Sequence, residues 1–291
     1  MLSSSWESEQ KLHNMIDWSD TKNHWMKPQI KQQITDFQNM VVEKEFAEAV
    51  EQHRVEEIYW VGGEPLMYEQ HWRYMKRIIE LGDGQNVYAR YNTNLSRVDY
   101  SGHNLYRDIL EHIRDWQICA SLDGTGAVGE YIRTGLDFEK WCRNFEQGLE
   151  HQRNPRQMRI DFTLTLPGLF ELENIQNLAN KYNVMILCKV IFSFSPDIVM
   201  SPLALPREIL HPLLSKLSNK TPPGAIKDTL IELLQRPTFQ EQWPDRYRQG
   251  LIKGKSRITK IEQVRKDSFT MTDILQQEPS IHEWWKNIGT D

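Results

Sequence analysis

Small polar residues and bare glycines stand where several apolar stretches of the sequence end. These positions are 62–65, 92–94, 121–124, 163–165 and 192–195. Hydrogen-bonding groups of this kind suit a site that holds a polar small molecule. They include no Cys–His pair, no cluster of histidines and no facing pair of carboxylates, so the chemistry would come from a bound cofactor. Each of these residue types also occurs in ordinary turns, so a single position predicts no site. The prediction of a site depends on finding such residues at the ends of several apolar stretches.

The apolar stretches read as strands that alternate with helices. The strands are expected at 57–61, 86–92, 116–124, 158–168 and 184–192, and the helices at 29–53, 70–81, 106–114, 138–149 and 172–178. Strict alternation with nearly continuous apolar strands predicts parallel pairing and helices on the outer faces. Because ligands gather at the carboxyl ends of such strands, we expect the polar positions to meet at one edge.

The pattern changes after Pro196. The remaining sequence is helical and interrupted by prolines, and it closes with two helical pieces separated at Pro279. We therefore divide the chain into an α/β unit at 1–205 and a mostly helical appendage at 206–291.

Composition excludes some classes of partner. The net charge of the 291-residue chain is −5, which gives no bulk attraction to nucleic acid or to an anionic membrane. No apolar run approaches the roughly 20 residues that span a bilayer, and the first residues contain no signal-peptide core. We expect a cytoplasmic protein. The three cysteines, Cys119, Cys142 and Cys188, lie in separate apolar segments and predict free packed thiols, with no metal site.

In order along the chain, the polar segments resemble motifs of the radical S-adenosyl-L-methionine (SAM) enzymes. "GGEP" at 62–65, "NTN" at 92–94 and "SLDGTGAVGEYIRTG" at 121–135 carry this likeness. The run that continues to "FEKW" is most similar to the branch with auxiliary-cluster (SPASM or twitch) domains, which includes phage and marine-bacterial members. The likeness covers roughly residues 3–206. It implies a partial (β/α)6-type parallel barrel that lacks its first strand.

The resemblance assigns the "GGEP" segment to the amino group of SAM. Gly62 and Gly63 would offer their backbone to the ammonium, because no Cβ prevents close approach. Glu64 would add a charge-assisted hydrogen bond or fix the turn, and Pro65 completes the motif.

The same resemblance assigns the later motifs. Ser121 and Asp123 match positions near the SAM carboxylate and ribose, and Arg133 matches a residue that pairs with the carboxylate. Asn94 and Thr165 are further polar contacts at their strand ends. Phe192 is either a neighbour of the adenine or a core side chain. No residue is assigned as catalytic.

The cluster ligands of that superfamily are missing from this sequence. Radical SAM enzymes bind a 4Fe–4S cluster through a CxxxCxxC loop, and an electron donor reduces it so that SAM is cleaved to a 5′-deoxyadenosyl radical. The present chain has no such motif, and its opening "MLSSSWESEQ" is similar to the stretch that follows the cluster loop. We therefore expect an N-terminally truncated domain that neither ligates the cluster nor forms the radical. The substrate of the full-length enzyme is unknown, and a peptide is one candidate.

Two other functions stay open. The chain could be a cluster-free, catalytically dead barrel that serves as a SAM-binding or partner-binding module. It could also be an unrelated α/β-barrel hydrolase or isomerase that uses Glu64, Asp123 and His103 as acid and base, although His103 lies in a polar stretch where a solvated loop is expected.

Overall fold

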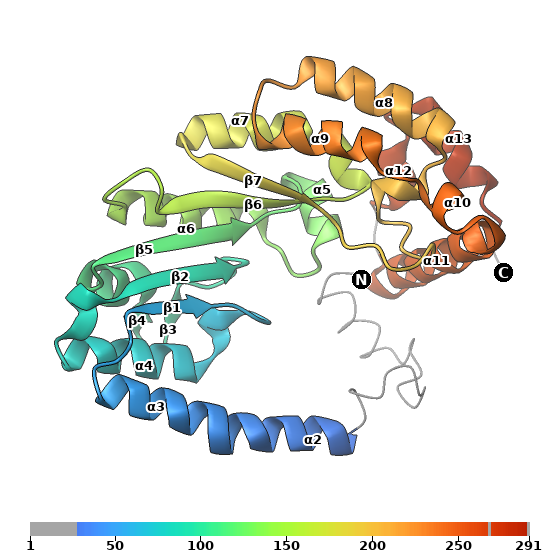
Figure 1. Ribbon diagram of the computed structural model, residues 1–291. Helices are drawn as coiled ribbons and strands as arrows, with labels where there is room; N and C mark the ends of the chain where they lie inside the picture. The colour runs from blue at the N-terminus through green and yellow to red at the C-terminus, as the bar shows by residue number, and fades with distance from the viewer. Residues whose placement is uncertain (1–27, 267–268, 290–291) are drawn as a thin grey trace.

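One parallel sheet forms the centre of the protein. The computed structural model describes residues 28–266 and 269–289, so the "MLSSSWESEQ" segment lies outside the described residues. The sheet has five strands in the order β1-β2-β5-β6-β7, all parallel: β1 (Glu57–Trp60), β2 (Tyr88–Thr93), β5 (Asp115–Ser121), β6 (Met158–Leu164) and β7 (Met185–Val190). Figure 1 shows these strands running in one direction, with β1 and β7 at the edges. The predicted alternation of strands and helices is confirmed.

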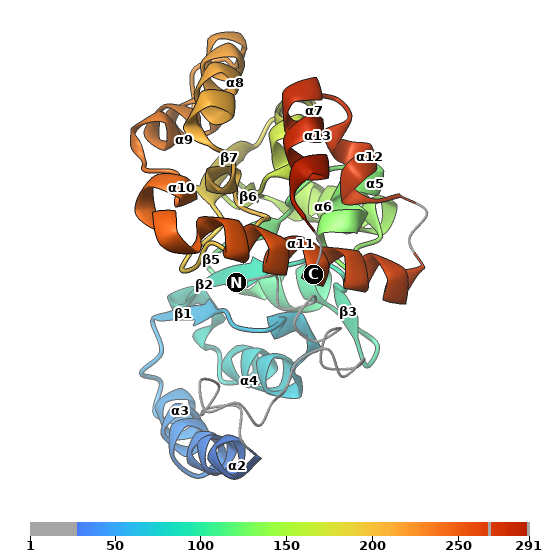
Figure 2. The same cartoon turned by 90° about the vertical axis from the view of Figure 1, so that its right-hand side faces the viewer.

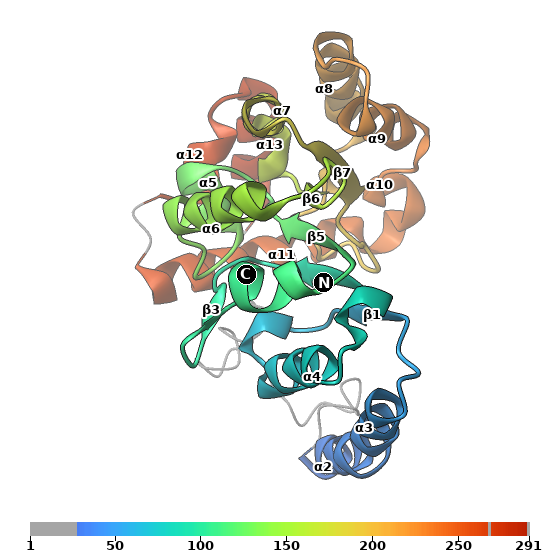
Figure 3. The same cartoon turned by 90° about the vertical axis from the view of Figure 1, so that its left-hand side faces the viewer.

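Helices cover one side of this sheet. They are α3 (Glu43–Glu51), α4 (Glu69–Glu80), α5 (Gly126–Ile132), α6 (Phe138–His151) and α7 (Leu172–Tyr182). Helix α2 (Pro28–Phe37) precedes α3, and its apolar side chains Ile34 and Phe37 are exposed. A π-helical turn at Gln38–Val42 joins α2 to α3, so the helix predicted over 29–53 is confirmed as one nearly continuous rod. Figure 3 shows α4, α6 and α7 following one another along the same side.

The segment predicted as helical at 106–114 is helical up to His112 but is not a regular α-helix. This segment forms a π-helical turn at Leu105–Ile109 and a 3-10 turn at Leu110–His112, and β5 begins at Asp115. The Asn104 side chain accepts hydrogen bonds from the backbone N–H groups of Tyr106 and Arg107 and so caps the start of the π-helical turn. A small antiparallel hairpin, β3 (Asp99–Tyr100) with β4 (His103–Asn104), also escaped prediction.

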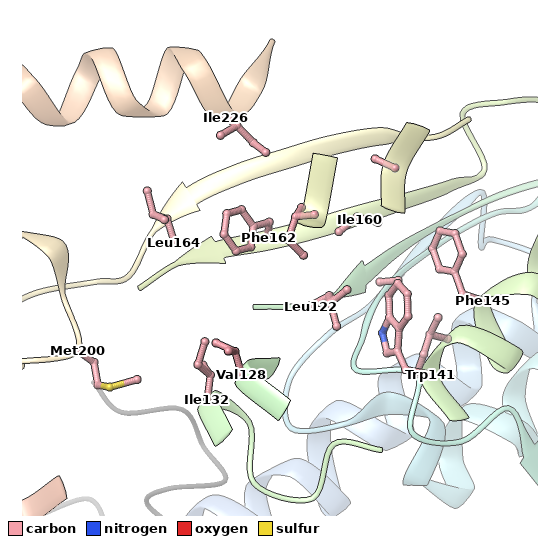
Figure 4. Packing of buried hydrophobic residues seen from close by; sticks show 14 of the residues in the cluster. Leu122, Val128, Ile132, Trp141, Phe145, Ile160, Phe162, Leu164, Met200 and Ile226 are labelled. Atoms are coloured by element: carbon pink, nitrogen blue, oxygen red, sulfur yellow. The ribbon is translucent and has the colours of Figure 1, made fainter. Parts of the chain in front are cut away.

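The helix-covered face of the sheet is apolar. Ile160 and Phe162 of β6 are fully buried, and Figure 4 shows them on the side where Trp141 and Phe145 of α6 lie. A Cβ on Gly148 of α6 would come within 2.6 Å of the Met158 methyl group, so this glycine allows α6 to approach β6 closely.

The opposite face is polar and partly exposed. Alternation along the strands places on it Tyr59, Arg90, Gln117, Cys119, Arg159, Asp161, Lys189 and Leu187. The nearly continuous apolar segment 184–192 therefore does not form a buried strand: β7 is an edge strand, and Met185 is 50% exposed. Apolar continuity alone cannot tell an edge strand from a central one.

A helical region follows the sheet, as predicted. It comprises the 3-10 turn η8 (Pro202–Ala204), α8 (Arg207–Lys220), α9 (Ala225–Gln235), α10 (Phe239–Gln242), α11 (Pro244–Arg265), α12 (Met271–Leu275) and α13 (Pro279–Asn287). Pro279 opens α13, which confirms the predicted break. No helix within residues 28–266 and 269–289 is long and apolar enough to cross a membrane.

Helix α11 crosses the carboxyl ends of the strands. Figure 2, which views the molecule from that side, shows α11 running in front of the sheet. Two glycines permit the close packing: a Cβ on Gly250 would lie 2.7 Å from Pro196, and one on Gly254 would lie 2.5 Å from the Asp197 carbonyl oxygen. The Tyr247 hydroxyl also donates a 2.8 Å hydrogen bond to the Ala204 carbonyl. The region is thus packed onto the α/β unit.

Candidate functional site

The backbone after β1 is open. Gly62 has a φ of +104°, a left-handed conformation that favours glycine, and a Cβ there would meet no atom of the described residues within 4 Å. The carbonyl oxygens of Gly62 and Gly63 accept no hydrogen bond from any residue that the structure describes. A Cβ on Gly63 would meet only the end of the Tyr68 side chain, at 2.6 Å. These two residues therefore present accessible main-chain acceptors.

Glu64 holds two strand ends together. Its buried carboxylate accepts hydrogen bonds from the Thr93 hydroxyl at 2.6 Å, from the Asn94 N–H at 2.7 Å and from the Leu66 N–H at 3.2 Å. Burial raises the pKa of Glu64, and these bonds and the charge of Arg133 act in the opposite direction. Of the two roles considered for Glu64, its contacts match the fixing of the turn. Pro65 begins the 3-10 turn Pro65–Met67 directly after it.

Asp123 and Arg133 form the charged part of the same edge. Arg133 Nε donates a 2.7 Å hydrogen bond to Asp123 Oδ2, and Asp123 Oδ1 accepts from the Thr163 N–H at 3.1 Å. The Asp123 side chain is 7% exposed and the Arg133 side chain 23%. Within the described part of the chain, the terminal nitrogens of Arg133 have no hydrogen-bond partner. The guanidinium is therefore oriented through Nε, and no residue that the structure describes prevents its terminal nitrogens from binding an anion.

The remaining predicted positions differ in accessibility. Ser121, at the end of β5, is half-buried, and its hydroxyl has no partner among residues 28–266 and 269–289. Asn94 uses its side-chain oxygen to accept the Ser96 N–H at 2.9 Å. Thr165 is buried, and its hydroxyl accepts the Gly168 N–H at 3.0 Å, which supports the turn after β6. Asn94 and Thr165 thus carry turn contacts at these strand ends.

Phe192 is not a core residue. Its side chain is 71% exposed and stacks on Phe194 with ring centroids 6.1 Å apart. The core interpretation failed because Phe192 lies beyond the last hydrogen-bonded residue of β7, where the chain leaves the sheet.

The helical region contacts the Arg133 segment directly. The Tyr131 hydroxyl donates a 2.7 Å hydrogen bond to Glu262 of α11, and Arg265 Nη1 donates to the Tyr131 carbonyl at 3.2 Å. Glu262 also accepts the Met271 N–H at 2.7 Å. The sequence did not predict these contacts between the helical region and α5. No local signal in the sequence pairs Tyr131 with Glu262.

His103 lies in a different hydrogen-bond network from Glu64 and Asp123. Its Nε2 pairs with Lys76 Nζ of α4 at 3.0 Å, beside a cavity of ≈ 710 Å³ lined by α4 and the β3–β4 hairpin. The structure therefore does not bring these three residues together as a hydrogen-bonded acid–base set.

The cysteines do not make a cluster-binding loop. Cys119 lies on β5, Cys142 on α6 and Cys188 on β7, and all three are free. Among the described residues, no group of three or more His, Cys, Asp and Glu side chains could hold a metal ion. Burial raises the pKa of the Cys188 thiol to about 11, so this side chain is a neutral packing group.

The protein has a parallel α/β fold, and polar residues lie at the carboxyl ends of its strands. Comparison with known protein families finds no family that matches the chain, and comparison with curated proteins finds no similar sequence.

Proposed function

We propose that this chain is a SAM-binding domain of the radical SAM type and that it binds the amino-carboxylate end of SAM at the edge formed by Gly62, Gly63 and Arg133. The observation that carries the proposal is a main-chain edge that has no donor among the described residues, followed directly by Glu64, whose carboxylate is close enough to the oriented Arg133 guanidinium for that charge to oppose the rise in pKa that burial causes. The order of the motifs along the sequence supports it independently.

The ammonium would lie against the glycine backbone. The carbonyl oxygens of Gly62 and Gly63 are acceptors without an internal donor among the described residues, and open space surrounds the Cβ position of Gly62. Glu64 contributes by fixing the turn, and its negative charge favours a cation nearby.

The carboxylate would lie against Arg133. Asp123 holds Nε, so the outer nitrogens of the guanidinium present a planar fork that matches two carboxylate oxygens. The Ser121 hydroxyl, at the end of the neighbouring strand β5, can donate one further hydrogen bond. The residues present therefore fit the amino-carboxylate group of SAM.

They do not fit an iron–sulfur cluster. The cysteines are dispersed over β5, α6 and β7, and the sequence has no CxxxCxxC motif. In a radical SAM enzyme the cluster supplies the electron that cleaves SAM, and this chain supplies no ligands for it. Residues 1–291 alone thus correspond to the cluster-free, catalytically inactive binding module, and the radical chemistry, with its electron donor, belongs to the full-length enzymes that the motifs resemble.

The polar face of the sheet supports the partial-barrel part of this proposal. A parallel sheet normally buries both faces under helices. Here one face carries Arg90, Arg159, Asp161 and Lys189 beside partly exposed apolar residues. Such a face suits the lumen of a partial barrel that receives a polar substrate, for which a peptide is one candidate.

Isothermal calorimetry with SAM tests the proposal. We expect weak, saturable binding to the full chain, because the iron that anchors SAM elsewhere in the superfamily is missing. Arg133→Gln should weaken binding about tenfold, the loss expected for one charge-assisted contact. Arg143→Gln is the matched control, because Arg143 is a 62% exposed arginine on α6. No binding, or equal binding by both variants, would refute the proposed site.

Anaerobic reconstitution with iron and sulfide distinguishes a cluster-free binding module from a radical SAM enzyme that binds the cluster. The full chain should acquire no stoichiometric 4Fe–4S cluster. A stoichiometric cluster would overturn the assignment as a cluster-free module and restore the enzymatic function to this chain.

A further inference from the structure

The polar face of the sheet contains one arginine whose charge is not matched. Two of its cations have carboxylate partners: Arg90 Nη1 lies 3.3 Å from Glu57 Oε1, and Lys189 Nζ lies 2.6 Å from Asp161 Oδ2. A third carboxylate, Asp115, accepts the Gln157 side-chain amide at 2.7 Å and the Trp116 N–H at 2.8 Å. Each carboxylate of this face is therefore already engaged.

Arg159 has only a weak acceptor. Its Nε donates to Cys119 Sγ at 3.0 Å, and no carboxylate of the described residues lies within 4.0 Å of its guanidinium. Burial raises the pKa of the Cys119 thiol, so this neighbour is neutral and does not balance the charge. Arg159 is half-buried, which removes part of its hydration. A guanidinium in this situation binds an anion favourably.

We propose that Arg159 on β6, together with Asn92 two strands away on β2, forms a subsite for the carboxylate of a small polar ligand on the open face of the sheet. Strand register supports the grouping, because Asn92 pairs with Cys119 and Cys119 pairs with Arg159. Ser121 and Asp161 form the next row of the same face, about 7 Å nearer the carboxyl edge.

A carboxylate suits this position better than a phosphate. Asp161 lies two residues from Arg159 on the same face of β6, and it repels a second negative charge. A single negative charge would balance the charge of Arg159, which has no carboxylate partner among the described residues. The planar fork of Arg159 also matches the two oxygens of a carboxylate.

The subsite lies on the face of the sheet, nearer the amino ends of the strands than the carboxyl edge where SAM is proposed to bind. A ligand whose carboxylate contacts Arg159 would extend along the face past Ser121 toward Arg133. Its assignment as a substrate therefore rests on the proposed function, whereas anion binding by Arg159 does not.

Nuclear magnetic resonance on the full chain tests anion binding directly. Sodium acetate is titrated while the Nε–H signal of Arg159 and the backbone N–H signal of Cys119 are followed. We expect saturable shifts of both signals with acetate. In Arg159→Gln the Cys119 signal should no longer respond, and in Arg156→Gln, which changes an exposed arginine just before β6, it should respond as in the unmodified protein.

Titrations with sodium chloride and with sodium phosphate at equal ionic strength are the controls that could contradict the proposal. Equal shifts with chloride would mean charge screening and would overturn the subsite. Tighter saturation with phosphate would overturn the carboxylate assignment. SAM calorimetry on Arg159→Gln should give unchanged affinity. An acetate response without SAM binding would refute the proposed function alone, and SAM binding without an acetate response would refute this inference alone.

Discussion

Tyr131 of α5 and Glu262 of α11 share a 2.7 Å hydrogen bond although they are 131 residues apart in sequence. Tyr131 precedes Arg133 by two residues, so α11 is tied to the segment that carries the oriented guanidinium. The tie is reinforced by Arg265, which donates to the Tyr131 carbonyl. The helical region therefore takes part in positioning the candidate site.

This tie should be measurable as a coupling. Tyr131→Phe and Glu262→Gln should each lower the free energy of unfolding, with a coupling of about 1 kcal/mol in a double-mutant cycle by urea denaturation. SAM affinity should fall about fivefold in either variant. Tyr182→Phe is the control, because Tyr182 makes a similar 2.8 Å bond to Glu146 away from the edge. Additive single effects would contradict the coupling.

Glu64 should be a structural residue of the edge. Glu64→Gln replaces one of the two carboxylate oxygens by an amide NH2 group, which would face either the Asn94 N–H at Oε2 or the Thr93 hydroxyl and the Leu66 N–H at Oε1. We expect a loss of about 1–3 kcal/mol in the free energy of unfolding. Glu69→Gln, at an exposed position in the first turn of α4, should change it by less than about 0.5 kcal/mol. Chemical denaturation checks both, and an unchanged stability of Glu64→Gln would refute the role.

His71 should make the fold sensitive to acid. It is fully buried between aromatic rings, its Nε2 pairs with the Tyr91 hydroxyl at 3.1 Å, and burial lowers its pKa from 6.5 to about 3. The unfolded chain takes up this proton below about pH 6.5 but the folded chain does not, so stability falls as the pH drops from 6.5 toward 3.

The size of this effect follows from the two pKa values. Between pH 8 and pH 5, His71 alone should lower the free energy of unfolding by about 2 kcal/mol. In His71→Phe this part of the pH dependence should vanish, whereas the contributions of the other ionisable groups stay. Urea denaturation of both proteins at the two pH values measures the difference, and parallel pH curves would show that folded His71 titrates normally.

The packing of α11 should tolerate no side chain at Gly254. A Cβ there would lie 2.5 Å from the Asp197 carbonyl oxygen and 2.6 Å from a Val199 methyl group. Gly254→Ala should therefore destabilise the protein by about 1–3 kcal/mol. The control is Gly289→Ala, whose Cβ would meet Ile252 at an ordinary 3.9 Å. Thermal or urea unfolding compares the two, and equal stability would show that α11 shifts freely.

Local patterns in the sequence predicted most of the sheet. The alternation of Val87, Ala89 and Tyr91 placed β2 and its buried face, because the period of side chains along a strand is fixed by backbone geometry. The turn signal Pro167-Gly168 likewise placed the turn after β6, although the strand itself already ends at Leu164. Both depend on residues close together in the chain, where the pattern contains the needed information.

Contacts between distant segments could not be predicted in this way. Glu64 meets Thr93 across 29 positions, so its use in fixing the turn became visible only when β1 and β2 were paired. The side chains of β7 are partly exposed because β7 is an edge strand. The apolar sequence of this strand does not predict that position in the sheet. The ionic environment of Arg159 likewise depends on three neighbouring strands.

The crossing of α11 makes the two halves of the sheet mechanically unequal. Its close contacts lie with residues 196–199 after β7 and with α5 after β5, so it braces the side that carries Arg133. Gly62 and Gly63 follow the edge strand β1, at the other end of the sheet. A ligand held between Gly63 and Arg133 would therefore act as a crosslink from the braced half to the unbraced one. Hydrogen exchange should then slow most in β1 and β2, the strands of the half that α11 does not brace.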